Sequence, residues 1–397
     1  MKQPEIKVNF NGRSLVYTDA EIESVVDVMR NAPGLTQGTQ LNRFEEAFGD
    51  YHGFKNCFAT STAATALELC AILARVGPGD EVIVPAHTYC ASAIPFGRAG
   101  AKLVWADLDP KTFVISAESV RKLITPATKA LVVVHLYGLP AEMDEIAAIA
   151  REHNIVLIED CAQALGAEYR GQKVGTWADL SVWSFQSQKN ITTLGEGGML
   201  RVKSEATAAI VPGLRHNGHA GFGEREHYWL PAMSNIDEDL EEVWPYNFCL
   251  SEAQCALGVE LLKRVDEINA ARGALAEQIR SELSDCSELC FQEVPEHCKS
   301  AWHLLPARFS GGENVTRDDF ISLMAYEFGV KVIIQYYPLY RYDLFRKKGF
   351  GAADCPETDA FFDSMVSFPF DLWRANGQVD ELVAATRKAI AQIKLKS

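Results

Sequence analysis

Short apolar runs alternate with segments of helical periodicity over most of residues 55–205. Seven runs of four to nine residues have the apolar, β-branched character of buried strands. They are 57–60, 81–86, 102–108, 130–138, 154–160, 180–185 and 197–202. Between them, 62–76 and 141–154 have the spacing of amphipathic helices. This alternation predicts an α/β fold, with a mostly parallel central sheet and helices on both faces.

The pattern changes after residue 250, where apolar residues recur at the spacing of one long amphipathic helix. These residues are Leu257, Leu261, Val265, Ile268, Leu275 and Ile279. Beyond it, 300–309 and 330–337 are predicted strands of a smaller α+β domain. With 397 residues, the chain is long enough for two domains. We expect a large domain over 1–255 and a small one over 256–397.

Charge and composition narrow the class of protein. The formal net charge of −15 argues against a nucleic-acid partner, because affinity for phosphates rests on lysine and arginine. No apolar run approaches the roughly 18 residues of a membrane span, and residues 1–12 lack the apolar core of a signal peptide. We therefore expect a cytoplasmic protein without a membrane partner.

Cysteine and histidine spacings do not favour a metal site. The ten cysteines are scattered, and several lie in apolar segments typical of buried, reduced thiols. Cys286, Cys290 and Cys298 cluster beside His297, but their spacing fits no common zinc pattern. His216, His219 and His227 are better explained as loop histidines. The acidic stretch 234–243 is predicted to be a surface loop.

Polar residues follow the predicted strands at the sheet edge where ligands of such folds bind. Asp160 ends the strand 154–160, Gln163 follows it, and Lys189 follows the strand 180–185. Taken alone, the carboxylate is equally well explained as a cap, and most lysines are solvated surface residues. The fold, however, would bring Asp160 and Lys189 to the same edge.

Two further features lie at this edge. Thr62, Ala63 and Ala64 open a helix, where they either cap it or present backbone N–H groups to a phosphate. Tyr89 follows a strand and either packs or lies against a flat ring. Together these features match what pyridoxal 5′-phosphate (PLP) requires of a protein. It needs a lysine that forms a Schiff base, an aspartate for the ring nitrogen, a phosphate site and an aromatic residue against the ring.

The chain resembles the DegT/DnrJ/EryC1/StrS sugar aminotransferases, which are PLP enzymes of fold type I. The resemblance covers nearly the whole length. Its most specific parts are EDCAQALGA and SFQSQKNITTLGEGG, and others are GLTQGTQLNRFEEAFGDYHG, GDEVIVPAHTYCASA and YNFCLSEAQCALG.

The resemblance implies a role for each motif residue. Lys189 would bind the cofactor aldehyde and shuttle the proton, Asp160 would pair with the pyridine nitrogen, and Gln163 would lie near the phenolic oxygen. Tyr89 would stack on the ring. Ser184 and the amides of Ala63 and Ala64 would hold the phosphate, with Thr62 beside them. Asn247 would reach the phosphate of a neighbouring subunit, which implies a homodimer with shared active sites.

Four positions depart from the family pattern. The phosphate turn has Ala63 and Ala64 where a Gly-Thr pair is common, although the backbone amides remain. Cys249 replaces an arginine usual near the substrate, and Tyr340 replaces a histidine. Tyr336, Tyr340, His216 and Arg215 are therefore candidates for binding an altered substrate, and Arg225 and Lys331 are further candidate cations.

A lysine at position 189 favours transamination over the dehydration catalysed by relatives with histidine there. The resemblance implies a ping-pong reaction from L-glutamate to a carbonyl sugar. The run 214–229 is similar to the branch that aminates C8 of a 3,8-dideoxy-octulosonate (Kdo-type) acid for lipopolysaccharide biosynthesis. The alternative acceptor is a nucleotide-linked 4-keto- or 3-keto-6-deoxyhexose.

Other classes of function fit less well. The first alternative is a PLP lyase or desulfurase. A desulfurase would need a cysteine on a mobile loop, and no cysteine lies in such a motif. A non-catalytic PLP-binding regulator would be expected to carry a basic DNA-binding segment. A nicotinamide dehydrogenase would need the motif GxGxxG after its first strand, and the residues after the first predicted strand do not contain it.

Overall fold

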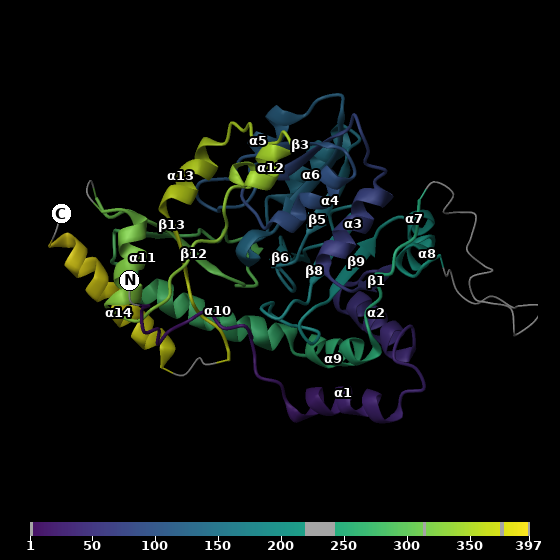
Figure 1. The fold of residues 1–397 in the computed structure, drawn as a ribbon, viewed down its shortest axis with the longest axis horizontal. Helices are drawn as coiled ribbons and strands as arrows, with labels where there is room; N and C mark the ends of the chain where they lie inside the picture. Colours follow the sequence, from purple (N-terminus) through teal and green to yellow (C-terminus); the bar gives the residue numbers. More distant parts are fainter. Residues whose placement is uncertain (1–2, 219–242, 313–314, 374–376, 396–397) are drawn as a thin grey trace, which may run out of the picture.

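A computed structural model describes residues 3–218, 243–312, 315–373 and 377–395. It contains a seven-stranded sheet and two three-stranded sheets. Figure 1 shows the large sheet and its helices on one side of the molecule, and the smaller part, with both chain ends, on the other. Arg225 lies outside the described residues, and so does the acidic stretch 234–243 except for its last residue.

The large sheet has the strand order β1-β9-β8-β5-β4-β2-β3. Strands β2, β3, β4, β5 and β8 run parallel, and β9 is antiparallel to both β8 and β1. The sequence therefore predicted the mostly parallel sheet correctly. The strands are β1 (Cys57–Thr60), β2 (Glu81–Pro85), β3 (Lys102–Ala106), β4 (Thr128–Val134), β5 (Val156–Asp160), β8 (Leu180–Ser184) and β9 (Gly198–Val202).

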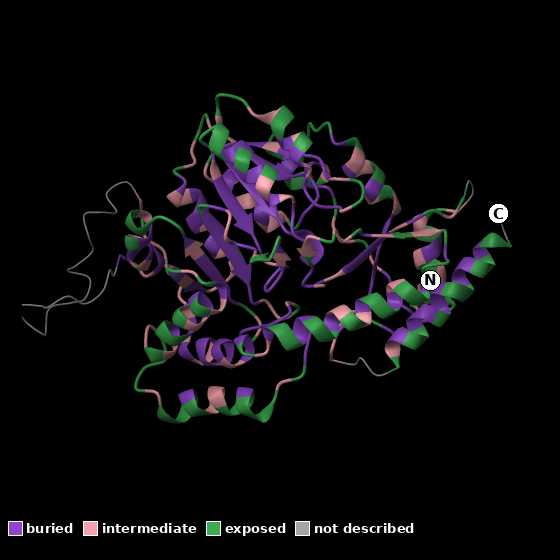
Figure 2. Ribbon diagram, turned by 180° about the vertical axis from the view of Figure 1, so that it is seen from behind, coloured by how far each residue is buried: buried purple, intermediate pink, exposed green. Residues whose placement is uncertain are grey.

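On strand β8, successive side chains point to opposite faces of the sheet and reach two different buried clusters. On β8, Leu180 and Val182 belong to one buried cluster, whereas Trp183 belongs to the other. Helices cover both cores: α3 (Ala63–Leu73) and α6 (Met143–Glu152) contribute to the first, and α2 (Thr39–His52) and α9 (Glu252–Leu262) to the second. The buried strands between these layers are visible in Figure 2.

Short helices complete the large part. They are α1 (Asp19–Asn31), η1 (Cys90–Ser92), α4 (Ile94–Arg98), α5 (Ala117–Leu123), η2 (Leu136–Gly138), α7 (Glu205–Ala209) and α8 (Val211–Arg215). The predicted strand 130–138 ends earlier, at Val134, and a 3₁₀ turn occupies its last residues. A small sheet of β6 (Glu168–Tyr169), β7 (Gln172–Lys173) and β11 (Cys298–Lys299) joins this part to the second half of the chain.

The predicted long helix after residue 250 is two helices. The segment 263–264 separates α9 from α10 (Val265–Glu282), so that α9 packs on α1 and α2. In Figure 1, α10 continues from the large sheet toward the smaller part, where it contacts α14 (Gln378–Lys394). No helix of the described residues is long and apolar enough to cross a bilayer.

The second half of the chain contains an antiparallel sheet in the order β10-β12-β13. Its strands are β10 (Leu289–Phe291), β12 (Leu305–Phe309) and β13 (Met365–Phe368), and its other helices are α11 (Arg317–Tyr326), η5 (Leu339–Arg341), α12 (Asp343–Lys347) and α13 (Pro356–Ser364). The predicted strand 330–337 was wrong: only single bridges, at Val330 and Ile333, tie it to other segments. Residues 334–337 instead lead into the cavity described next.

Candidate active site

A cavity of about 540 Å³ lies at the carboxyl ends of β4, β5 and β8. The parallel register places Val134, Asp160 and Val182 side by side, so that the residues following these strands meet at one edge. Nine of the predicted site residues line the cavity. They are Thr62, Ala63, Ala64, Tyr89, Asp160, Gln163, Ser184, Lys189 and Tyr336.

Asp160 is a buried carboxylate at the end of the central strand β5, with a side chain 3 % exposed. The Ser92 hydroxyl donates to Oδ2 at 2.7 Å, and the Ala162 N–H donates to Oδ1 at 3.0 Å. Burial raises the pKa of Asp160, and these hydrogen bonds and the positive charge of Lys189 oppose that rise only in part. A cation bound against this carboxylate would therefore be strongly stabilised.

Lys189 lies in the turn after β8, and its side chain lines the same cavity. Burial lowers the pKa of its amine to about 8, although Asp160 and Glu196 both favour the charged form. The Ser14 hydroxyl donates to the Lys189 carbonyl at 2.5 Å, which fixes the turn to the N-terminal segment. An amine with this pKa is partly uncharged near neutral pH and can act as a nucleophile or a base.

Helix α3 begins at the cavity wall and provides an anion site built from the main chain. Thr62 is its N-cap and forms a capping box with Thr65, so both hydroxyls are bound within the turn. The N–H groups of Ala63 and Ala64 lie in the first turn of α3, where an α-helix offers no carbonyl acceptor to them. The helix dipole also favours an anion at this end. Ser184 lines the cavity beside them.

Gly198 of β9 permits this arrangement. A Cβ at Gly198 would lie 2.5 Å from the Thr62 carbonyl and 2.6 Å from the Ala63 nitrogen. Any side chain at this position would displace the start of α3. Gly198, the last glycine of the GEGG turn, thus permits the close approach of β9 to the anion site.

Two aromatic rings, Tyr89 and Tyr336, line the same cavity as Asp160. The Tyr89 ring is 57 % exposed and meets the Tyr336 ring edge-on, with centroids 5.9 Å apart. The Gln163 amide donates from Nε2 to the Tyr336 hydroxyl at 3.0 Å and accepts the Tyr137 N–H at 2.7 Å. Gln163 therefore links the segment after β5 to the 334–337 segment of the second half of the chain.

The structure does not bring four predicted site residues into this cavity. The Arg215 guanidinium is buried and bonded to Glu45 and to the Ala59 carbonyl, which gives it a structural role in this chain. The Tyr340 hydroxyl is bonded to Asp359, away from the cavity. His216 and Asn247 pair through an isolated β-bridge, and Asn247 is exposed.

In this chain the Arg215 and Tyr340 side chains thus bind carboxylates outside the cavity wall, and their expected contact with substrate stays a prediction. The family resemblance made both of them candidates for the substrate site, but each side chain bonds a partly buried carboxylate. Lys331, the further candidate cation, is exposed and bonds through its backbone to Val8, outside the cavity wall. Asn247 remains a prediction, since its expected contact is with a second subunit.

Several residues of the cavity wall were not singled out from sequence. Ser92 and Glu196 flank Asp160 and Lys189, His303 lies 3.5 Å from the Lys189 amine, and Arg13 and Arg272 line the wall. Arg13 belongs to the N-terminal segment and His303 to the second half of the chain. His303 lies within the predicted strand 300–309, and nothing in the sequence around it indicated a site.

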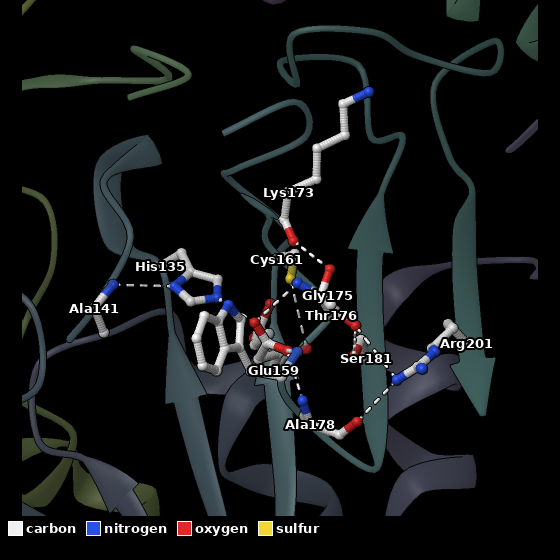
Figure 3. A network of polar contacts seen from close by, with 12 residues as sticks. His135, Ala141, Glu159, Cys161, Lys173, Gly175, Thr176, Ala178, Ser181 and Arg201 are labelled. Atoms are coloured by element: carbon white, nitrogen blue, oxygen red, sulfur yellow. Dashed lines mark hydrogen bonds and ion pairs between the residues drawn. The ribbon is translucent and has the colours of Figure 1, made fainter. Parts of the chain in front are cut away.

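A second polar cluster, drawn in Figure 3, surrounds Glu159, the residue before Asp160 in strand β5. Glu159 is fully buried, and its carboxylate bonds His135 Nε2 at 3.1 Å. Its two oxygens also accept three backbone N–H groups at 2.8–3.0 Å. These belong to Gly175, Trp177 and Ala178. The carboxylate thus ties the loop between β7 and β8 to the central strand.

The same cluster brings His135, Glu159 and Cys161 within 4.8 Å, a spacing compatible with a metal ion. The donor set does not suit one. The Ala141 N–H donates to His135 Nδ1 at 3.1 Å, which leaves Nε2 carrying the proton that Glu159 accepts. Both Glu159 oxygens are occupied, so this cluster is a structural support of the strand that carries Asp160.

Glu159→Gln is expected to destabilise the protein by about 3 kcal/mol, because an amide NH₂ would face backbone N–H donors and a charge-assisted network would be lost. Urea unfolding of the cofactor-free protein measures this change. The matched control is Glu145→Gln, at an exposed carboxylate paired with Arg121, which should shift stability little. Equal stability of Glu159→Gln and wild type would contradict the structural role.

The residues of the cavity fit PLP. The buried Asp160 carboxylate suits a protonated ring nitrogen, the start of α3 suits a phosphate, and Lys189 suits an aldehyde. The Tyr89 ring offers an aromatic face. All four lie on the wall of one cavity large enough for the cofactor and a small substrate.

Comparison with known proteins agrees with this fit. Residues 16–387 match the model of the DegT/DnrJ/EryC1/StrS aminotransferase family. The GDP-perosamine synthase of Caulobacter vibrioides is 38 % identical over 286 residues, 72 % of this chain and 73 % of that protein. The L-glutamine:2-deoxy-scyllo-inosose aminotransferase of Streptomyces kanamyceticus is 33 % identical, over 81 % of this chain and 76 % of that one.

A solved structure is similar over nearly the whole chain. The putative sugar aminotransferase Spr1654 of Streptococcus pneumoniae, in a pyridoxamine-phosphate form, superimposes with a TM-score of 0.85 and 25 % identity, covering 98 % of this chain and 100 % of that one. The family match spans far more than half of the sequence. The chain therefore belongs to the DegT/DnrJ/EryC1/StrS aminotransferase family and is a PLP-dependent transaminase of the sugar aminotransferase type.

Proposed function

We propose that this aminotransferase moves the amino group of L-glutamate to C8 of a 3,8-dideoxy-octulosonate acid, a sugar of lipopolysaccharide, by a ping-pong reaction. The acceptor would be a free sugar acid, without a nucleotide. The observation that supports an acidic acceptor is Arg13, an arginine on the cavity wall.

Arg13 is held by aromatic rings and has donors available for a ligand. Its guanidinium carbon lies 4.0 Å from the centroid of the Trp373 ring and 5.0 Å from that of Tyr17. No acidic side chain of the described residues lies within ion-pair distance of it. Arg272, by contrast, donates to the Trp302 and His303 carbonyls. Arg13 can therefore bind a carboxylate with two parallel hydrogen bonds.

PLP, when bound, supplies an electrophilic aldehyde and a ring that withdraws electrons from the reacting carbon. In our proposal Asp160 keeps the ring nitrogen protonated, and Gln163 lies near the phenolic oxygen. Ser184 and the Ala63 and Ala64 amides, next to Thr62, bind the phosphate. Tyr89 stacks on the ring.

Lys189 is the proposed proton carrier. Its amine would carry a proton between the α-carbon of the amino donor and the aldehyde carbon of the cofactor, and it would reverse this transfer on the sugar. A pKa of about 8 suits both directions, because the amine can accept and release a proton near neutral pH. Tyr336 lines the cavity where the substrate would lie.

We also propose a cytoplasmic homodimer in which Asn247 completes the site of the partner subunit. Asn247 is exposed and outside its own cavity, which supports a contact with a second copy. All ten cysteines are free thiols, as expected in a reducing compartment. Within each subunit we propose two domains, 1–255 and 256–397, each with its own sheet.

A donor and acceptor screen tests the reaction. The purified enzyme is expected to absorb near the yellow band of bound PLP, to lose that absorption with L-glutamate, and to regain it with the 8-oxo sugar acid. L-Glutamine is the rival donor, by similarity to the inosose aminotransferase. A spectrum restored by a nucleotide-linked keto sugar and not by the sugar acid would contradict the proposed acceptor.

Arg13→Gln is expected to raise KM for the sugar acid about tenfold or more, since a charge-assisted pair contributes ~1.5–3 kcal/mol. The value of kcat should change little, because Arg13 does not contact Lys189. Steady-state kinetics with the acceptor varied measure this split. Arg30→Gln, at an exposed arginine of α1 paired with Glu23, is the control and should leave both constants unchanged.

The second candidate is a nucleotide-linked 4-keto- or 3-keto-6-deoxyhexose aminotransferase. The 38 % identity to GDP-perosamine synthase favours it. An anionic diphosphate would also be attracted by Arg13, so charge alone does not separate the two acceptors. The screen does, because it compares the free sugar acid with the nucleotide-linked sugar on the same enzyme.

A further inference from the structure

A chain of buried side-chain amides leads from the main chain to the amine of Lys189. Asn269 of α10 donates from Nδ2 to the Leu165 carbonyl at 2.8 Å. Its Oδ1 accepts from Asn190 Nδ2, also at 2.8 Å. Both asparagines are buried, with side chains 6 % and 5 % exposed. Asn190 directly follows Lys189 in the sequence, so this series of amides includes the immediate neighbour of the reactive lysine.

Two backbone carbonyls fix the orientation of this chain. A carbonyl only accepts hydrogen bonds, so the atom of Asn269 that faces Leu165 must be the NH₂ group. Asn190 Nδ2 also donates to the Ala301 carbonyl, at 2.7 Å. Neither amide can then be flipped without two donors or two acceptors meeting. The oxygen of Asn190 therefore faces the next member, His303.

The orientation of Asn190 determines which nitrogen of His303 carries the proton. His303 Nδ1 lies 3.2 Å from Asn190 Oδ1, which can only accept. Nδ1 is therefore protonated, and in the neutral ring Nε2 holds a lone pair. Burial, together with the positive charges of Lys189 and Arg272, lowers the pKa of His303 well below its ordinary value. The ring is neutral across the physiological range.

The Nε2 lone pair of His303 faces the amine of Lys189. The distance from Nε2 to Nζ is 3.5 Å, the long end of hydrogen bonding. The main chain of His303 is held in place, since its carbonyl accepts from Arg272 Nη2 at 2.7 Å and its backbone N–H donates to the Tyr137 carbonyl at 3.0 Å. The hydrogen bonds around Lys189 thus connect residues 165, 189–190, 269 and 303, which lie far apart in the sequence.

We propose that His303 is a positioning residue of the transaminase, which accepts a hydrogen bond from Lys189 Nζ through a tautomer fixed by Asn190 and Asn269. The inference rests on the transaminase activity and not on the identity of the sugar. A hydrogen bond from one N–H of the amine to His303 leaves the nitrogen lone pair to point elsewhere, into the cavity. When Lys189 carries a proton, the same acceptor stabilises the ammonium.

A neutral acceptor suits this position better than a carboxylate would. The charges that face Lys189 are Asp160 from β5 and Glu196 from the turn before β9, and both favour the ammonium. A third carboxylate would hold the proton on the amine, whereas an imidazole orients it without adding charge. Arg272 lies behind His303 and disfavours a proton on the ring.

The test compares His303→Met with His303→Gln in the cofactor-free enzyme. Both side chains are unbranched and of similar length, but only glutamine offers an amide oxygen to Lys189. PLP is added over a range of pH, the link to Lys189 is reduced with borohydride, and the labelled peptide is counted by mass spectrometry. The pH profile of labelling reports the pKa of the Lys189 amine and requires no turnover.

In His303→Met, loss of the acceptor is expected to raise the acid dissociation constant of Lys189 about tenfold, so that labelling begins at lower pH. His303→Gln should follow the wild-type profile within about twofold. A purely packing role for His303 would not separate these two variants. His297→Met, at a histidine paired with Glu142 outside the cavity, is the control and should leave the profile unchanged.

Asn190→Leu provides a second test that keeps the imidazole. Without the Asn190 oxygen the ring proton is free to move to Nε2, so the acid dissociation constant of Lys189 should again rise. Thermal unfolding identifies the variants that fold, and Asn190→Leu decides the matter if His303→Met does not. Wild-type profiles in the folded variants, or equal shifts in His303→Met and His303→Gln, would overturn the proposal.

Discussion

Lys189→Ala is expected to abolish transamination, with a loss of at least ~10³-fold in kcat, because the same amine binds the cofactor and carries the proton. The side chain lines the cavity with its pKa lowered to about 8, and the other described residues of the cavity wall include no second lysine. Stopped-flow absorbance with L-glutamate measures the half-reaction directly. Borohydride reduction should leave no cofactor attached to position 189.

The control for this variant is Lys102→Ala, at an exposed lysine paired with Glu81 at the end of β3. It removes the same side chain far from the cavity and should keep wild-type activity. A Lys189→Ala enzyme that still completed many turnovers would show that another group moves the proton. Retention of PLP by Lys189→Ala without a covalent link is compatible with the proposal, since the phosphate site is independent of the lysine.

Asp160→Asn is expected to change activity and stability in opposite directions. The loss in kcat should be ~10²–10³-fold, the size expected when one preorganised electrostatic contact to the reacting group is removed. The cofactor-free protein, in contrast, should become more stable at neutral pH. Asparagine keeps the geometry, because its oxygen can accept the Ala162 N–H and its NH₂ can donate to Ser92.

The sign of the stability effect follows from the raised pKa of Asp160. Below the unfolded-state pKa of about 3.9, the carboxyl is protonated in both states and has no ionisation penalty. As pH rises toward the higher pKa of the folded state, the unfolded chain releases its proton first, so folding becomes less favourable. The stability gain of Asp160→Asn should therefore be larger at pH 7 than at pH 4.

Urea unfolding of both cofactor-free proteins at these two pH values measures the difference. Asp343→Asn, at an exposed carboxylate paired with Arg346, is the control and should show little change at either pH. An Asp160→Asn protein that is less stable than wild type at pH 7 would contradict the account. With PLP bound the order should reverse, because the ring nitrogen then supplies the missing cation.

The residues that the sequence placed correctly in the cavity are those whose position follows from one strand. Asp160 ends β5 and Ser184 ends β8, and a parallel sheet brings such ends to one edge. Thr62 precedes α3, where a threonine is a helix signal. Local pattern and sheet geometry were sufficient for these residues, and they also predicted both layers of helices.

The residues that the sequence missed, and the candidates that lie outside the cavity, depend on packing between distant segments. Nothing in the run around Arg215 shows that Glu45, 170 positions earlier, takes its guanidinium. In the same way, His303 reaches Lys189 across 114 positions through the fold of the second half of the chain. The segment 330–337 has the composition of a strand, but its last residues form the cavity wall instead.

The capping box of α3 affects which substitutions this protein can accept near its anion site. Because Thr62 and Thr65 bind each other, the anion site rests on main-chain N–H groups that almost any amino acid supplies. Positions 63 and 64 can therefore exchange small residues over evolutionary time without loss of the site. Proline alone would delete a donor. The constraint lies instead at Gly198 on the neighbouring strand, where even one added methyl group would move the helix.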